Sequence, residues 1–118
     1  MAVTAGTFPI EVTLRGRVGR YIGEYAQAKV AAALRVAEGR VLGARVVLDV
    51  RRSHADGAAL AEALVDLAGQ TVSVSATAPT MVEAIDQLET RLRRRLVEVR
   101  ARARTQARRP ARGAARPR

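Results

Sequence analysis

A single narrow apolar stripe near the C-terminal end constrains the fold more than any other feature of this chain. Its large side chains recur at steps of three and four residues: Met81, Ile85, Leu88, Leu92, Leu96 and Val99. That spacing puts them on one side of an α-helix. Thr80 precedes the stripe and Glu83 follows three residues later, which is the spacing of a capping box. The sequence therefore predicts a helix from residue 81 to about Ala103 that buries one face and exposes the others.

The chain before this helix alternates between apolar and polar residues in four segments. Each is predicted to be a strand with one buried face, and they span residues 10–15, 45–51, 61–67 and 71–77. Between the first two, apolar residues from Ile22 to Ala37 recur at a helical period until Gly39 ends the pattern. The predicted order is β-α-β-β-β-α. This order indicates an α+β fold, with a four-stranded, mainly antiparallel sheet and two helices packed on one face.

The domain boundaries follow from where these periodic patterns stop. The 118 residues are 48% hydrophobic, enough for the core of one domain, which we expect to span residues 9–104. Residues 1–8 show no periodicity and are expected to form a flexible N-terminus. From residue 105 the composition is reduced almost entirely to Arg, Ala, Pro and Gly. We therefore expect residues 105–118 to be a disordered tail or linker without a core.

The positive charge of the chain is concentrated at one end. Residues 1–90 carry a net charge of −1, whereas residues 91–118 carry +11, with Glu98 as the only acidic residue. On a helical projection centred on Leu92, Arg94 points directly away from the buried stripe. The other arginines of the predicted helix fall on its two flanks: Arg91, Arg95 and Arg102 on one, and Arg93, Arg100 and Arg104 on the other. Such a charge asymmetry points to a polyanionic partner.

Phosphate groups are the partner chemistry that this helix suits, because a guanidinium can donate to two phosphate oxygens at once. A helix whose charges only keep it soluble usually carries both signs, so the run favours nucleic-acid binding. The residues we expect to bind RNA are Lys29, Arg91, Arg94, Arg95, Arg100, Arg102, Arg104 and Arg20. The aromatic residues Phe8, Tyr21 and Tyr25 lie in no predicted strand. Recognition should therefore use phosphates and shape rather than bases stacked on a sheet.

Motifs typical of enzymes are absent from the sequence. It has no Gly-rich phosphate loop, no Gly-x-Ser-x-Gly, no cysteine and one histidine, His54, in a predicted turn. The carboxylates of the polar sheet face are expected to be solvated and to pair with Arg45 and Arg51 across strands. We expect neither catalytic residues nor a cofactor, metal or small-molecule substrate. No apolar run is long enough to span a membrane, which favours a cytoplasmic protein.

The helix-two pattern Met81-x-x-Ala84-Ile85-Asp86-x-Leu88-x-x-Arg91-Leu92-x-Arg94-x-Leu96 carries a family resemblance. Together with the β-α-β-β-β-α order, it resembles the ribosome hibernation-promoting factor family, which includes ribosome-associated inhibitor A and the sigma-modulation proteins. Two further segments are similar to the corresponding segments of this family: Ala28-Lys29-Val30 on the first predicted helix and the predicted strand at residues 45–50. The resemblance covers roughly residues 9–104.

The resemblance implies a non-enzymatic translation regulator of the stress response. Such proteins bind the small ribosomal subunit and the intact ribosome in the channel for messenger and transfer RNA, and hold ribosomes idle in dormancy. By position, the residues that grip ribosomal RNA are Lys29, Arg91 and Arg94, followed by Arg100. The family has a basic cluster where this chain has Val97, Glu98 and Val99, so Arg95, Arg102 and Arg104 are expected to compensate. On helix one, Gly19, Gly23 and Ala32 replace the usual basic or polar residues.

Two other functions fit the same residues. The helix–sheet order also resembles that of double-stranded RNA-binding domains, which would make the chain a general duplex binder. A protein–protein adaptor that uses helix one or the polar sheet face is the third hypothesis. Long family members add a C-terminal dimerisation module, which we expect this chain to lack. Its tail then reads either as the natural end of a short form or as the start of a linker.

Overall fold

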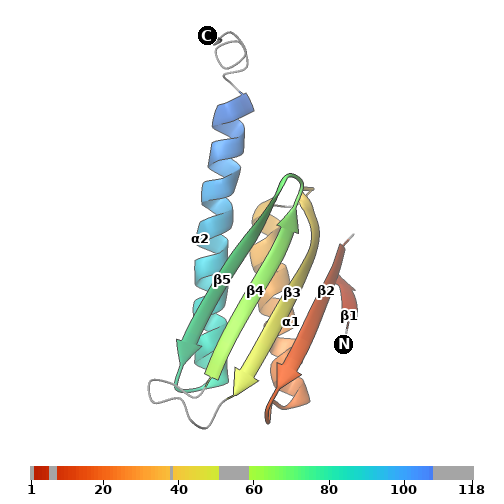
Figure 1. Cartoon of the computed structure of the whole chain (residues 1–118), viewed down its shortest axis with the longest axis vertical. Coiled ribbons are helices and arrows are strands. Elements are labelled where there is room, and N and C mark those ends of the chain that lie inside the picture. Colours follow the sequence, from red (N-terminus) through yellow and green to blue (C-terminus); the bar gives the residue numbers. More distant parts are fainter. Residues whose placement is uncertain (1, 6–7, 38, 51–58, 108–118) are drawn as a thin grey trace.

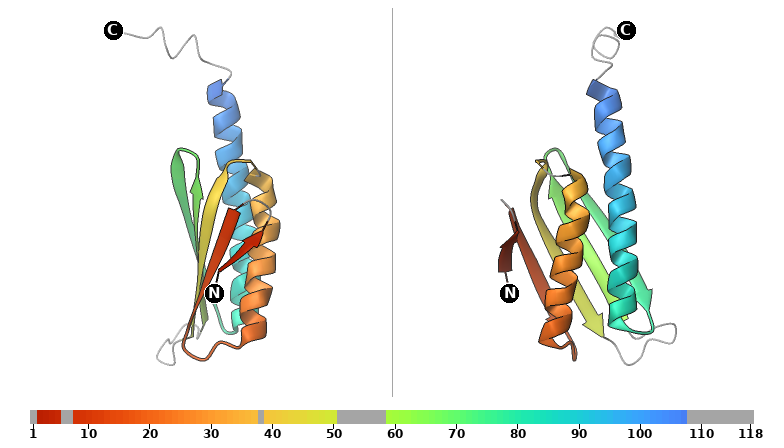
Figure 2. Two further views of the ribbon diagram at one scale, coloured as in Figure 1. Left: turned by 90° about the vertical axis from the view of Figure 1, so that its right-hand side faces the viewer. Right: turned by 180° about the vertical axis from the view of Figure 1, so that it is seen from behind.

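Five strands form one sheet in the order β1-β2-β3-β4-β5, and two helices cover one of its faces (Figure 1, Figure 2). The computed structural model describes residues 2–5, 8–37, 39–50 and 59–107, so His54, Arg51 and residues 108–118 lie outside it. The elements are β1 Ala2–Ala5, β2 Phe8–Arg15, α1 Arg20–Leu34, the 3₁₀ turn η1 Arg35–Ala37, β3 Val41–Val50, β4 Ala59–Leu67, β5 Gln70–Ala78 and α2 Met81–Ala107. The predicted β-α-β-β-β-α order and the placement of both helices on one face are confirmed.

The sheet is mixed because α1 lies between β2 and β3 in the chain. The helix crosses over, so β3 runs parallel to β2, with Leu14 opposite Leu48. All other neighbouring strands pair antiparallel. Ala68 and Gly69 form the two-residue turn between β4 and β5, and Gly69 has a φ of 94°, a conformation that glycine adopts without strain.

The N-terminal strand corrects one expectation. Ala2–Ala5 pairs with β2, with Val3 opposite Ile10, whereas we expected residues 1–8 to be flexible. The pairing adds a fifth strand at the edge of the sheet. Phe8 begins β2, so one aromatic residue does lie in a strand. Backbone groups make the pairing, and four residues are too few for a hydrophobic period to show in the sequence.

The core lies between the sheet and the two helices. In β4 every second residue from Ala59 to Leu67 is buried, which is the alternation that the sequence predicts. The α2 stripe meets this face, and Ile85, Leu88, Leu92 and Leu96 are fully buried. The stripe from Met81 to Val99 therefore holds α2 against the sheet over about five turns.

Helix α2 begins at the predicted cap and ends later than predicted. The backbone N–H of Glu83 donates to Thr80 Oγ1 over 3.2 Å, and the Thr80 hydroxyl donates to Glu83 Oε1 over 2.9 Å. At the other end, the helix continues through Ala107, although we expected disorder from residue 105. Alanine and arginine are both strong helix formers, so the helix extends after its last buried residue, Val99.

The last turns of α2 project beyond the sheet and α1 (Figure 1, Figure 2). Ala101, Arg102 and Arg104 are all exposed. Neither helix among the described residues is apolar over a stretch long enough to cross a membrane.

Candidate nucleic-acid interface

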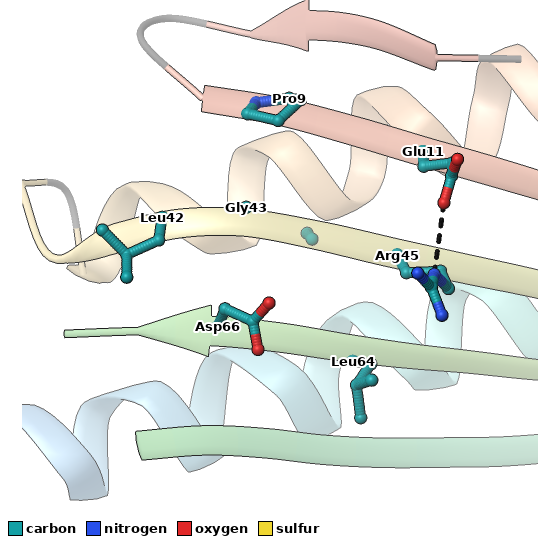
Figure 3. Close-up of a pocket in the computed structure, with 8 residues that line it drawn as sticks. Pro9, Glu11, Leu42, Gly43, Arg45, Leu64 and Asp66 are labelled. Carbon is teal, nitrogen blue, oxygen red and sulfur yellow. Dashed lines mark hydrogen bonds and ion pairs between the residues drawn. The ribbon is translucent and has the colours of Figure 1, made fainter. Parts of the chain in front are cut away.

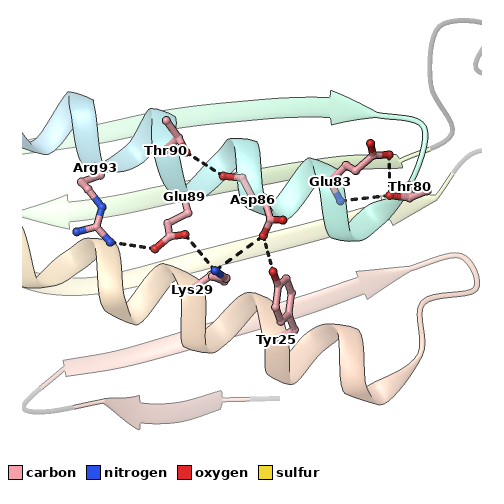
Figure 4. Close-up of polar contacts among 8 residues, drawn as sticks. All are labelled: Tyr25, Lys29, Thr80, Glu83, Asp86, Glu89, Thr90 and Arg93. Atoms are coloured by element: carbon pink, nitrogen blue, oxygen red, sulfur yellow. Dashed lines mark hydrogen bonds and ion pairs between the residues drawn. The ribbon is translucent and has the colours of Figure 1, made fainter.

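The first half of α2 is joined to α1 by a network of polar side chains (Figure 4). Lys29 Nζ lies 3.5 Å from Glu89 Oε1 and 4.0 Å from Asp86 Oδ1. The Tyr25 hydroxyl donates a hydrogen bond to Asp86, and Lys29 Nζ lies 5.4 Å from the centre of the Tyr25 ring. Residues one turn apart on α1 thus meet residues one turn apart on α2, and the two helices run in the same direction.

This network raises the pKa of two of its members, Lys29 and Tyr25. The Glu89 carboxylate raises the pKa of Lys29, and the charge on Tyr25 and on Asp86 acts in the same direction. The hydrogen bond to Asp86 raises the pKa of Tyr25. Lys29 therefore stays charged, but two carboxylates of α2 already neutralise it. Among the predicted RNA-binding residues, it is the one with two carboxylates within 4.0 Å.

Two arginines on the flanks of α2 also make contacts within the domain. Arg91 Nη1 donates to the carbonyl oxygen of Ser75 over 2.8 Å, which occupies an acceptor at the edge strand β5. Arg93 Nη2 lies 2.9 Å from Glu89 Oε2, one turn earlier on the helix. The Arg91 flank thus faces β5 and the Arg93 flank faces α1, in agreement with the helical projection.

The remaining arginines of α2 form what we call the outer arginine row. Its members, all exposed, are Arg94, Arg95, Arg100, Arg102 and Arg104. Arg95 lies 4.0 Å from Glu98, with both side chains about half exposed, and such an ion pair in water adds little. Within the described part of the chain, the other four make no ion pair or hydrogen bond through their side chains. The row is thus a series of exposed cations available to an external anion.

Arg20 lies far from this row. It is the first residue of α1, and the contacts of Tyr25 with Asp86 and of Lys29 with Glu89 place the start of α1 beside the start of α2. Arg100 lies more than three turns further along α2 than these contacts. The structure therefore places Arg20 and the last members of the outer arginine row, from Arg100 to Arg104, at opposite ends of the helix pair.

The face of the sheet opposite the helices has a different character (Figure 3). Arg45 Nε lies 3.2 Å from Glu11 Oε1, as predicted, whereas the predicted partner Arg51 lies outside the described residues. Asp66 accepts a hydrogen bond from Thr71 over 3.2 Å. Leu42 and Leu64 line the same shallow hollow of about 360 Å³.

The carboxylates on this face are therefore dispersed rather than clustered. Throughout the residues that the structure describes, no three His, Cys, Asp or Glu side chains gather in a way that could hold a metal ion.

The sequence does not predict one cluster of basic residues that the structure brings together. Arg40 was not singled out, and Arg35 is an isolated charge on the first predicted helix, yet both line one hollow together with Arg100. No local pattern could reveal this cluster, because the third arginine is sixty residues away along the chain.

Comparison with known proteins identifies a family whose profile matches this chain. The profile of the family described as Sigma 54 modulation protein / S30EA ribosomal protein matches residues 10–104. No curated protein matches the sequence.

Two solved structures are similar to this chain. The N-terminal domain of Thermus thermophilus Protein Y has a TM-score of 0.63 and 27% identity, over 76% of this chain and 97% of that one. A ribosomal subunit interface protein from Coxiella burnetii has a TM-score of 0.64 and 18% identity, over 78% of this chain and 97% of that one, and this likeness concerns the fold.

Proposed function

Since the chain belongs to the Sigma 54 modulation protein / S30EA ribosomal protein family, which is ribosome-associated, we propose that it binds the small ribosomal subunit and keeps it from translating. The family description names a ribosomal protein and a modulation protein, not an enzyme. The proposed position of the domain is the channel for messenger and transfer RNA, where its presence would exclude both. In this proposal the protein acts in the cytoplasm, on subunits and intact ribosomes, in stress and dormancy.

The outer arginine row is the observation that carries the proposal. A ribosome presents RNA phosphates in irregular, closely spaced arrays, and each guanidinium can donate to two of their oxygens. The arginines of the row belong to a helix that Leu92 and Leu96 anchor in the core. The backbone positions of Arg94 and Arg95 are therefore fixed relative to the sheet. Because the row has hardly any internal partner, binding RNA does not require breaking ion pairs within the domain.

The charge of the row predicts how binding depends on salt. Five phosphate contacts give a slope of about −4.5 for the logarithm of the binding constant against the logarithm of the salt concentration. A fourfold rise in salt then weakens binding roughly 500-fold. A surface that bound through apolar contacts would respond far less.

Sedimentation in sucrose gradients tests the proposal directly. The purified chain, mixed with ribosomes or separated subunits, should migrate with the small subunit and with intact ribosomes at low salt, and should dissociate at high salt. A variant with Arg94→Gln, Arg95→Gln and Arg102→Gln should stay at the top of the gradient, with an unchanged melting temperature.

The matched control replaces three arginines outside the outer arginine row, with Arg15→Gln, Arg17→Gln and Arg45→Gln. It removes the same charge and should sediment like the parent protein. If the two triple variants behave alike, or if the parent stays at the top of the gradient at low salt, the proposal is wrong.

The rival hypothesis of a general duplex binder rests on the same row, since phosphate contacts alone do not distinguish RNAs. Competition separates the two functions. Bare duplex RNA, added at the same phosphate concentration as the ribosomes, should fail to displace a ribosome-specific protein and should displace a general binder.

A further inference from the structure

A small hollow lies where the end of α1 meets α2, away from the outward side of the arginine row. Its volume is about 180 Å³, and Arg35, Val36, Ala37, Arg40 and Arg100 line it. Arg35 begins η1, Arg40 immediately precedes β3, and Arg100 follows the last buried residue of α2. Three parts of the chain thus supply one arginine each.

The backbone beneath these side chains is held in place by the fold. The N–H of Arg40 donates to the carbonyl oxygen of Ala37, and the carbonyl oxygen of Arg40 accepts from the N–H of Ala68, both over 2.9 Å. Gly39 has a φ of 93°, which turns the chain sharply between η1 and β3. The N–H of Arg35 bonds to carbonyl oxygens of the last turn of α1. The backbone positions from which Arg35 and Arg40 project are therefore fixed by hydrogen bonds of the fold.

The charges in this hollow are not compensated within the described part of the protein. Among the described residues, its lining includes three arginines and no acidic side chain, and none of the three arginine side chains makes an ion pair or a hydrogen bond with another described residue. Glu38 lies outside the described residues. Lys29 and Arg93, on the same side of the helix pair, each have a carboxylate within 3.5 Å. Three like charges around one space repel each other, and an anion placed between them would remove that repulsion.

We propose that Arg35, Arg40 and Arg100 form a binding site for one phosphate group. Guanidinium groups match the oxygen geometry of phosphate, and three of them around one space can satisfy several oxygens together. The volume is small beside the roughly 300–1,000 Å³ of clefts that enclose drug-sized molecules. It suits a single phosphate rather than a whole nucleotide.

The phosphate can come from two sources, and the site itself does not depend on the proposed function. Free inorganic phosphate would fill it in the isolated protein. A phosphodiester of an RNA backbone would also fill it, and only this source rests on the proposed ribosome binding. The site would then fix the rotation of α2 on the RNA, because Arg100 alone of the three belongs to the outer arginine row.

The test uses the full chain and a double variant that leaves α2 intact, Arg35→Gln with Arg40→Gln. The matched control, Arg15→Gln with Arg17→Gln, removes two exposed charges at the end of β2. Inorganic phosphate is titrated against chloride at constant ionic strength, and the backbone amide signals of Val36, Ala37 and Arg40 are followed by NMR. In the second arm, ribosome binding is measured over a series of salt concentrations.

Two results support the proposal and distinguish the sources. Saturable shifts with inorganic phosphate, weakened about tenfold or more in the double variant but not in the control, indicate free phosphate. No such shifts, together with a salt slope of ribosome binding reduced by about one in the double variant and unchanged in the control, indicate an RNA phosphodiester.

If phosphate causes no saturable shifts and the two double variants bind ribosomes alike, the proposal is overturned. Parent protein that binds ribosomes in that experiment leaves the proposed function intact. Parent protein that saturates with phosphate but ignores ribosomes overturns the proposed function alone.

Discussion

The two ends of α2 carry similar side chains in different surroundings. In the first half of the helix, three polar residues contact α1 or β5: Asp86, Glu89 and Arg91. From Arg94 to Arg104, the arginines face solvent, and Glu98 is the only carboxylate between them in the sequence. Arg91 and Arg94 lie within one turn of each other, yet one is part of the internal structure and the other is free. Position on a basic helix therefore does not decide whether a charge is available to a partner; its neighbours do.

The helix dipole explains part of this charge distribution but not all of it. Carboxylates near the start of a helix and cations near its end both interact favourably with the dipole, an effect confined to the terminal turns. Glu83 and Arg104 fit that pattern. Arg94 and Arg95 lie in the middle of α2, where the dipole offers no advantage, so their presence is better explained by an external anion.

Removing one side chain from the buried stripe tests whether both ends of α2 depend on the same core, and it should have the largest effect. Leu92→Ala should lower the free energy of unfolding by about 2–5 kcal/mol, because it leaves a cavity between α2 and the sheet. Val97→Ala, at a side chain that is 51% exposed, should change it by less than about 0.5 kcal/mol. Urea denaturation followed by circular dichroism measures both. Equal losses would mean that α2 is not anchored by its stripe.

Exchanging single charges at the two ends should separate stability from binding. Arg94→Gln should weaken ribosome binding several-fold and reduce its salt slope by about one, without changing the melting temperature. Lys29→Gln leaves Asp86 and Glu89 facing each other without their cation, so it should lower the melting temperature and affect ribosome binding less. The comparison between the two ends fails if both variants lose stability, or if Lys29→Gln weakens ribosome binding more than Arg94→Gln.

The smallest effect concerns the pH dependence of the contact between the helices. Tyr25 and Lys29 both have a pKa raised above the usual values of 10.0 and 10.5, so the folded state holds their protons more tightly than the unfolded state. The stabilisation is therefore complete at neutral pH and is lost as the pH rises above about 10 through the folded-state pKa values.

A spectroscopic titration checks the cause of this shift. In a Tyr21→Phe background, where Tyr25 is the only tyrosine, ultraviolet absorbance reports its ionisation. Adding Asp86→Asn removes the carboxylate that accepts the hydrogen bond, and the pKa of Tyr25 should fall. Adding Glu62→Gln, on the other side of the sheet, is the control and should leave it in place. A Tyr25 titration unaffected by Asp86→Asn would contradict the described network.

The hydrophobic periodicity of the sequence predicts most of the fold, because the burial of one face of a strand or helix leaves a pattern in consecutive residues. The alternation at β4 and the α2 stripe are of this kind, as is the Thr80–Glu83 cap. Strand β1 left no such pattern, because it is held by backbone hydrogen bonds to β2. The last turn of α2 to Ala107 could not be predicted for a related reason: the stripe of large apolar residues that indicates the helix ends at Val99 in the sequence.

The basic character of the interface was likewise determined by sequence alone, since charge and helical angle are local properties. Which cations are free was decided only by tertiary structure. Lys29 meets Glu89, and Arg91 meets Ser75, across distances of sixty and sixteen residues in the chain. Arg35, Arg40 and Arg100 become neighbours only after α1 and α2 pack side by side. Electrostatic interactions depend on separation in space, and no pattern of consecutive residues encodes a separation that folding itself creates.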